Sequence, residues 1–340
     1  MALGVKHLFG DHNMSVPPWR DPSLISVPQC ADVWPCWTAS LFMRPFARAI
    51  IRRVKRVLRK LVPRSLRRAL GKRAYHALVV ADAILHRGSP LKPPQAITSV
   101  GSGDFEAVGE EFLRHFRAFA QLAPHDRVLD VGCGIGRMAI PLTRYLDGSG
   151  SYDGFDVVPH GIEWCRRRIT SRFPNFRFRC VSVRNDDYNP EGAVGAAEFV
   201  FPFDDASFDF VFLTSVFTHM MPHESAHYLR EIGRVLAPGG RCVSTWFLLT
   251  DEARELVAQA RCTLAFRHAI AHGMTTNPDV PGEAIAVDEQ YVRDSHRAGG
   301  LEVEDPVRYG SWSGRPAHVS YQDIVVSRRR AHAPTHVEFG

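Results

Sequence analysis

Three glycines at alternate positions, Gly132, Gly134 and Gly136, follow a short apolar run that carries one acid, Asp130. Glycine lets the backbone turn sharply and come close to a ligand where a Cβ atom would collide. The carboxylate of Asp130 would repel a pyrophosphate at such a turn and attract an α-ammonium group. The pattern therefore favours a ligand with an amino-acid head group over a dinucleotide.

Polar residues also fall at the ends of other predicted strands. Asp156, Asn185 and Thr214 lie at or just after the ends of three further apolar runs. Asp130 likewise lies near the end of its own apolar run. The alternation of strands and helices predicts a parallel sheet, and ligands of such sheets bind at the carboxyl ends of the strands. We therefore expect these side chains to share one crevice. The predicted strands are 127–131, 152–156, 176–183, 208–214, 241–247, 302–308 and 320–327.

The Asp130-x-Gly132-x-Gly134-x-Gly136 pattern after a strand resembles motif I of the class I S-adenosylmethionine-dependent methyltransferases. Three later segments resemble this family in the same order, and the whole resemblance covers about residues 105 to 327, being greatest to bacterial methyltransferase type 11 domains. It implies a Rossmann-like α/β fold with a doubly wound seven-stranded sheet whose last strand is antiparallel. The three later segments are 154–156, 201–209 and 228–243.

The resemblance also implies S-adenosylmethionine as the cofactor. Asp130 would lie near its ammonium group, Asp156 would accept hydrogen bonds from the ribose hydroxyls, and Asn185 or Asp186 would face the adenine amino group. A helix N-cap is the alternative role for Asp156. The residues expected to bind the cofactor are Asp130, Gly132, Cys133, Gly134, Gly136, Asp156, Val157, Asn185, Asp186 and Thr214.

A hydroxyl acceptor must lose a proton during methyl transfer, so the site needs a base. His219 follows the fourth predicted strand, and histidine titrates near neutrality. His219 is therefore the candidate base, with orientation of a loop or packing below the cofactor as its alternative roles. His219, His223 and His227 are spaced by four residues, but Pro222 should start or break a helix between them, so we expect no metal site.

Trp312 and Arg315 follow the sixth predicted strand and so fall on the crevice side. An aromatic ring and a guanidinium group suit a sugar ring or an anionic acceptor, and a buried turn is the alternative. Two insertions, 184–200 and a partly helical 248–287, should project above the crevice, where loops carry function. The expected reaction is methyl transfer from S-adenosylmethionine to a small-molecule acceptor, at a hydroxyl of a glycosyl or lipid-linked compound.

Other enzyme classes lack their required residues. A dehydrogenase would have no reason for Asp130, and no Tyr-x-x-x-Lys pair follows the fourth predicted strand. Known adenine methyltransferases carry Asn/Asp-Pro-Pro-Tyr/Phe after that strand, where this chain has 214–217, Thr-Ser-Val-Phe. The single Pro-Cys pair, at 35–36, lies outside the domain in which a cytosine C5 enzyme needs its nucleophile. An RNA methyltransferase and a non-catalytic S-adenosylmethionine-binding protein stay open as alternatives.

The net charge of +6 is unevenly distributed. Residues 44–73 hold 13 of the 42 Lys and Arg and no acid, which leaves 29 bases against 36 acids elsewhere. The catalytic domain is therefore acidic, and we do not expect it to bind nucleic acid. Residues 44–62 have apolar positions at helical spacing among the bases. Such a helix packs on its own domain, lies on an anionic membrane surface, or contacts RNA.

Composition predicts four segments: a poorly ordered 1–43, a basic helical extension and linker at 44–98, the methyltransferase domain at 99–330, and a tail at 331–340. The chain contains no run of 18 apolar residues and does not begin with a secretory signal. Seven scattered cysteines suit a reducing compartment. We expect a cytoplasmic protein, peripheral on the inner face of the membrane if residues 44–73 bind lipid. The sequence does not indicate which oligomeric state the protein adopts.

Overall fold

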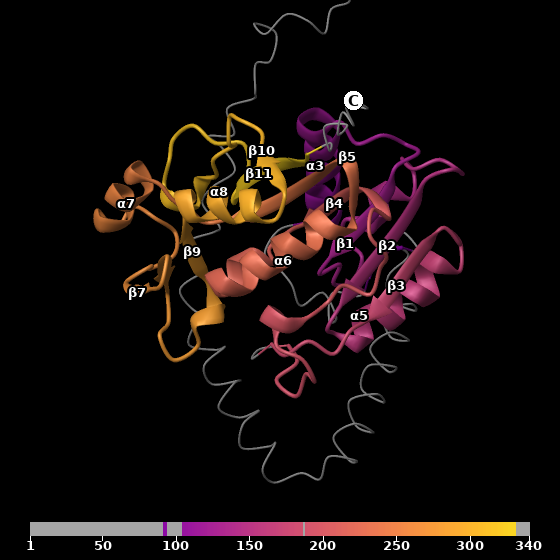
Figure 1. Ribbon diagram of the computed structural model, residues 1–340, viewed down its shortest axis with the longest axis horizontal. Coiled ribbons are helices and arrows are strands. Elements are labelled where there is room, and N and C mark those ends of the chain that lie inside the picture. Colours follow the sequence, from indigo (N-terminus) through magenta and orange to yellow (C-terminus); the bar gives the residue numbers. More distant parts are fainter. Residues whose placement is uncertain (1–90, 94–103, 186–187, 331–340) are drawn as a thin grey trace, which may run out of the picture. The chain divides into compact units, whose positions relative to one another are not determined.

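The computed structural model describes residues 91–93, 104–185 and 188–330 (Figure 1). These residues belong to one compact unit, Tyr75–Gly340. The predicted basic helix at 44–62, Asp186 and the C-terminal tail lie outside the described residues.

Seven strands form one sheet in the order β10-β11-β5-β4-β1-β2-β3. The pairs from β5 to β3 are parallel, whereas β11 runs antiparallel to both of its neighbours. The predicted doubly wound sheet with an antiparallel last strand is therefore confirmed. The strands are β1 (Arg127–Val131), β2 (Ser151–Asp156), β3 (Phe176–Cys180), β4 (Phe208–Leu213), β5 (Leu236–Trp246), β10 (Leu301–Val303) and β11 (Asp323–Arg329).

Two strands are shorter than predicted. Strand β3 ends at Cys180 instead of 183. Beyond Cys180 the chain leaves the main sheet, and Val183 forms an isolated bridge with Val194. Strand β10 ends at Val303 instead of 308, and Pro306, which has no N–H group to donate, lies in the loop that follows.

Both faces of the main sheet are apolar, and helices pack on each (Figure 1). Along β4, Phe210 and Phe212 join one buried cluster with α3, α4 and α5, while Val211 and Leu213 join another with α6 and α8. This follows from the alternation of side chains along a strand. None of the described helices is long and apolar enough to cross a membrane. They include α3 (Phe105–Ala120), α4 (Ala139–Leu142), α5 (Pro159–Cys165), α6 (Pro222–Val235), α7 (Asp251–Ala258) and α8 (Glu289–Ala298).

The predicted partly helical insertion at 248–287 contains α7 but also a second sheet that was not predicted. Its strands have the order β6-β9-β8-β7, and the 3-10 helix η7 (Pro281–Glu283) precedes β9. Strands of two to four residues are too short for an alternating pattern to reveal them. They are β6 (Leu248–Leu249), β7 (His268–Ile270), β8 (Gly273–Thr275) and β9 (Ile285–Asp288).

Candidate active site

The glycine turn after β1 has a left-handed backbone at each of its three glycines. The φ angles are 79° at Gly132, 55° at Gly134 and 80° at Gly136. A Cβ atom at Gly132 would lie 2.5 Å from Cγ2 of Val216, in the loop after β4, whereas one at Gly134 would meet no atom within 4 Å. The turn is therefore closed by protein at Gly132 and faces open space at Gly134, where a ligand can approach the backbone.

Asp156, at the end of β2, holds this turn in place. Its Oδ2 accepts a hydrogen bond from the backbone N–H of Gly134 (2.8 Å), and its Oδ1 accepts one from Val158 (2.8 Å). Burial raises the pKa of Asp156, and the backbone donors, which include Val157, oppose that rise. The carboxylate thus orders the bend that leads into α5. This role is similar to the predicted alternative of a helix N-cap, although the N-cap residue of α5 is Val158. Each oxygen retains acceptor capacity for a ribose hydroxyl.

Cys133 lies inside the turn with its side chain buried. Its backbone N–H donates to the carbonyl oxygen of Phe155 (3.0 Å), which ties the turn to β2. Burial raises the pKa of the Cys133 thiol well above its ordinary value. The thiol therefore stays protonated and has no nucleophilic character.

Asp130 lies beneath the turn and is 1% exposed. Its Oδ2 accepts a hydrogen bond from the hydroxyl of Tyr152 (2.6 Å), while its Oδ1 has no hydrogen-bond partner among the described residues. Burial raises the pKa of Asp130 to about 8; the Tyr152 hydrogen bond opposes this rise and the charge of Asp156 adds to it. Buried acceptors are nearly always paired, so this oxygen fits a ligand that brings a donor, such as an ammonium group.

The predicted adenine contacts lie in the loop after β3. The side-chain oxygen of Asn185 accepts a hydrogen bond from the backbone N–H of Tyr188 (3.0 Å) and so helps to close its own turn. Asp186 lies outside the described residues, and the adenine role of this pair stays a prediction. Thr214 directly follows β4 and is half-buried.

His219 is the last residue of the 3-10 helix η6 (Phe217–His219). Its backbone N–H donates to Val216 (3.0 Å), the residue that packs beside Gly132. Its ring Nδ1 lies 2.9 Å from the carbonyl oxygen of Gly282, in η7. A carbonyl oxygen can only accept, so the neutral ring carries its proton on Nδ1 and keeps the lone pair on Nε2. The imidazole is thus oriented by Gly282, and its Nε2 has the lone pair that can accept a proton.

The other two histidines of the spaced series are placed differently. His223 is exposed in the first turn of α6, and Nε2 of His227 lies 2.9 Å from the carbonyl oxygen of Phe199. Helix α6 begins at Pro222, as the sequence predicts, so His219 is not on it. Within the described ranges, no three His, Cys, Asp or Glu side chains are grouped as metal ligands.

Comparisons with known proteins agree with this geometry. Residues 129–244 match the family model of the methyltransferase domain. The chain carries a class I S-adenosylmethionine-dependent methyltransferase domain. The predicted family and its cofactor are thereby confirmed.

Two of the curated proteins to which this chain is similar are methyltransferases of known substrate class by name. A phthiotriol/phenolphthiotriol dimycocerosates methyltransferase of Mycobacterium leprae is 39% identical over 153 residues, 44% of this chain and 47% of that protein. A fatty-acid O-methyltransferase of Mycolicibacterium smegmatis is 32% identical over 167 residues, 49% and 52% of the two chains. The chain thus spans about half the length of these relatives. Among solved structures, the PH0226 protein of Pyrococcus horikoshii has a TM-score of 0.48 and 17% identity, covering 69% of this chain and 95% of that one.

Trp312 is buried, so its ring does not face an acceptor in the crevice as the sequence predicted. Trp312 lies in the 3-10 helix η8 (Ser311–Ser313) and is 1% exposed. Its ring packs against Phe247 and Phe266, with centroids 5.2 and 5.4 Å away. The insertion covers this corner of the sheet, so the buried-turn alternative is the one observed.

Arg315 is also buried, with 7% of its surface exposed. Its guanidinium lies 4.0 Å from the ring centroid of Tyr309, donates to the hydroxyl of Thr250, and pairs with Glu252 at 3.2 Å. These contacts occupy the side chain within the protein. Arg315 therefore supports the insertion and was wrongly predicted to bind the acceptor.

Three residues of the methyltransferase domain near the crevice were not predicted. Ser215, directly after Thr214, has a positive φ of 57°, which is costly for a residue other than glycine and is found often at functional sites. Its Oγ accepts a hydrogen bond from Nε2 of Gln322 (2.8 Å), just before β11. The neighbouring Tyr321 is 44% exposed. Only their position at strand ends could have indicated them.

Proposed function

We propose that this protein transfers a methyl group from S-adenosylmethionine to a hydroxyl group of a lipid-linked small molecule. The observation that carries the proposal is the orientation of His219. Its Nδ1 donates to Gly282, and its Nε2 is left as a proton acceptor three residues from Val216, which packs on the glycine turn. A positioned base of this kind suits an acceptor that must lose a proton.

The geometry of the site suggests a role for each of these residues. Asp130 would pair with the ammonium group of the ligand, and Gly134 would allow the backbone to approach it. Asp156 would accept from ribose hydroxyls while it holds the turn. S-adenosylmethionine supplies the activated methyl group when bound, and His219 would hold the proton that the acceptor releases. The 3-10 helix η7, through Gly282, would keep the imidazole in place.

The lipid part of the acceptor is supported by two of the curated proteins to which this chain is similar. One is named for phthiotriol and phenolphthiotriol dimycocerosates and the other for fatty acids. The glycosyl alternative was based on Trp312, and the burial of that ring leaves it without support. An apolar acceptor with one reacting hydroxyl is therefore the proposed substrate class.

Cofactor binding tests the proposal first. Changing Asp130 to asparagine keeps the shape of the side chain and an acceptor for Tyr152 but removes the charge that would face the ammonium group. Loss of one charge-assisted hydrogen bond costs about 1.5–3 kcal/mol, so we expect roughly 10- to 100-fold weaker binding of S-adenosylmethionine. Titration calorimetry measures this, with Glu255→Gln, at an exposed position of α7, as the matched control.

The same titration has a defined pH dependence. The pKa of Asp130 is raised to about 8 by burial, so at neutral pH the carboxyl is largely protonated and must release a proton to pair with the ammonium group. Affinity should thus rise between about pH 6 and 7.5, below the range in which an α-amino group loses its own proton. The Asp130→Asn protein should lack this rise. Absence of any binding by the wild-type protein would refute the proposed function.

Attachment to an anionic membrane through residues 44–73 is a second part of the proposal. The support is compositional: these residues hold 13 bases, and a base near such a surface contributes about 1 kcal/mol. Deleting them should strongly weaken sedimentation with phosphatidylglycerol vesicles at low salt, and added salt should weaken the binding of the full chain. Equal sedimentation of the two proteins would show that this segment does not bind lipid.

A further inference from the structure

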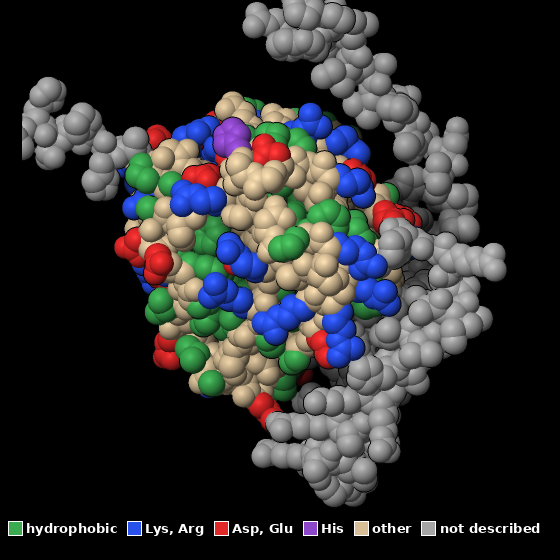
Figure 2. Space-filling view, turned by 90° about the vertical axis from the view of Figure 1, so that its right-hand side faces the viewer, with side chains coloured by type: hydrophobic (Ala, Val, Ile, Leu, Met, Phe, Trp, Pro, Cys, Tyr) green, Lys and Arg blue, Asp and Glu red, His purple; other side chains and the backbone are tan. Residues whose placement is uncertain are grey.

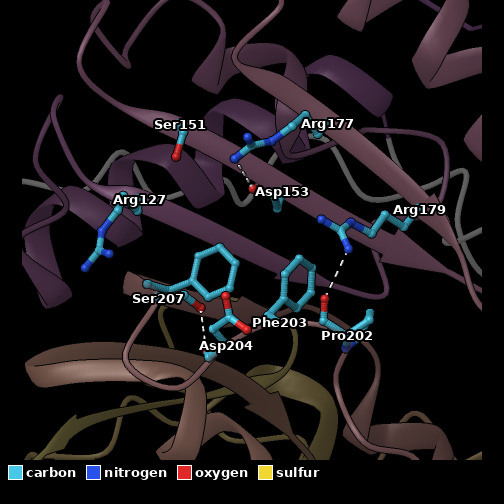
Figure 3. A pocket seen from close by; sticks show the side chains of 10 residues that line it. Arg127, Ser151, Asp153, Arg177, Arg179, Pro202, Phe203, Asp204 and Ser207 are labelled. Atoms are coloured by element: carbon cyan, nitrogen blue, oxygen red, sulfur yellow. Dashed lines mark hydrogen bonds and ion pairs between the residues drawn. The ribbon is translucent and has the colours of Figure 1, made fainter.

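A groove lies on one face of strands β1, β2 and β3, and Figure 3 shows side chains that line it. It is lined by Arg127, Ser151 and Phe208, the first residues of β1, β2 and β4, and by four residues of the loop before β4. These four are Pro202, Phe203, Asp204 and Ser207. The lining of the groove does not include Asp130, Asp156 or His219. The groove, of about 430 Å³, is thus separate from the candidate active site.

The groove exists because no α-helix covers this part of the sheet. In the described parts of the connection between β3 and β4, the only helical element is the 3-10 helix η5 (Ala196–Glu198). The loop that follows packs Phe199, Phe201 and Phe203 against Phe155. Strands β2 and β3 therefore keep an open stretch beside this loop.

Strand β3 directs two arginines into the groove. Phe176 and Phe178 are buried in the core, so Arg177 and Arg179 point to the opposite face, roughly 7 Å apart. Arg177 donates through Nη2 to Asp153 (2.6 Å), and Arg179 donates through Nη1 to the carbonyl oxygen of Pro202 (3.1 Å). A guanidinium has five N–H groups, so each keeps donors for a ligand.

Asp153 adds an acceptor to this pair of cations. It is 3% exposed and lines the groove; its Oδ2 binds Arg177, while its Oδ1 has no hydrogen-bond partner in the described part of the chain. A buried carboxylate oxygen without a donor fits a ligand hydroxyl. Guanidinium groups match phosphate oxygens in geometry and charge. One ligand that satisfies both is a phosphate ester with a neighbouring hydroxyl.

The surface around the groove favours an anion. Residues 104–330 hold 31 acids and 25 arginines, yet residues 166–184 hold seven arginines and no acid. Six of the seven are exposed. Figure 2 views the side of the molecule on which β3 and α5 lie, and basic side chains are spread across this face. A local positive field on an acidic domain attracts anionic ligands to this side.

We propose that Arg177, Arg179 and Asp153 form a binding site for a hydroxyl-bearing phosphate ester such as a glycerol phosphate. The two guanidinium groups bind the phosphate, and Oδ1 of Asp153 accepts a hydrogen bond from the hydroxyl. The same chemistry is presented by a soluble ester and by the headgroup of phosphatidylglycerol. The site is independent of the proposed methyl transfer, because Asp130, Asp156 and His219 do not line the groove.

The test uses the full-length protein and two double variants with the same change in charge. Arg177→Gln/Arg179→Gln alters the groove, whereas Arg167→Gln/Arg172→Gln alters exposed arginines outside it. Calorimetry with glycerol 3-phosphate should show about tenfold or greater weakening for the groove variant only. Inorganic phosphate should bind the wild-type protein more weakly than glycerol 3-phosphate, and Asp153→Asn should remove that difference. Unchanged S-adenosylmethionine binding confirms that each variant is folded.

Vesicles of phosphatidylglycerol distinguish the two sources. If the groove variant sediments less than the control variant, the lipid headgroup is the ligand; if only glycerol 3-phosphate binding is lost, the ligand is a soluble ester. If both double variants bound the probes equally weakly, the effect would come from the net charge alone. The proposed binding site would then be wrong. It would also be wrong if the wild-type protein failed to bind either probe.

Discussion

Replacing His219 with alanine is expected to lower kcat by about 10²- to 10⁴-fold, while the affinity for S-adenosylmethionine changes by less than about twofold. The imidazole is oriented by Gly282 with Nε2 available to take a proton, and no contact places it in the walls of the glycine turn. Its loss should therefore remove proton transfer and leave cofactor binding intact. The measurement is turnover of S-adenosylmethionine with a hydroxylated lipid, beside calorimetry of cofactor binding.

His223→Ala is the matched control, because His223 is exposed in α6 only four residues away. Its kcat should equal that of the wild-type protein. A His219→Ala protein with full activity would exclude the base role and favour the alternative of loop orientation. A wild-type protein that binds the cofactor but turns over no acceptor would support a non-catalytic S-adenosylmethionine-binding protein.

Truncating Trp312 to alanine is expected to lower the free energy of unfolding by about 3–5 kcal/mol. The indole is 1% exposed, and Phe247 and Phe266 pack against it. Its Nε1 also donates to Oδ2 of Asp323 (2.7 Å), so truncation removes both apolar packing and one donor to a buried carboxylate. Urea denaturation followed by circular dichroism measures the loss.

Trp312→Phe separates the two contributions. It retains most of the aromatic volume and removes the N–H group, so the loss should be smaller, about 1–3 kcal/mol. If instead Trp312→Ala were as stable as the wild-type protein and specifically lost acceptor binding, the ring would belong to the substrate site and its packing role would be wrong.

The main sheet could be predicted because all of its strands except β10 have five or more residues, with apolar side chains in a continuous run or at alternate positions. The second sheet could not, since β6 has two residues and β7 and β8 have three each. That difference explains the error at Trp312. Its place after a strand indicated the crevice side, but the ring is buried by Phe247 and Phe266, which flank or belong to the insertion.

The candidate site shows the same division between local and distant causes. The turn at Gly132, Gly134 and Gly136 could be predicted, because glycine adopts φ > 0 without the steric cost that other residues have. That tolerance is a property of the residue type alone. The orientation of His219 depends on Gly282, 63 residues later, and the burial of Asp130 depends on Tyr152. Contacts at such separation leave no periodicity in a single sequence.

Strand β3 lies at the edge of the main sheet, with β2 as its single neighbour there. An edge strand exposes backbone donors and acceptors that can pair with the edge of a second molecule and start a continuous intermolecular sheet. Arg177 and Arg179 place two positive charges on this edge, so two copies meeting there would repel each other. We therefore expect the arginines of the groove also to oppose aggregation through β3, so that a chain without them becomes less soluble as its concentration rises.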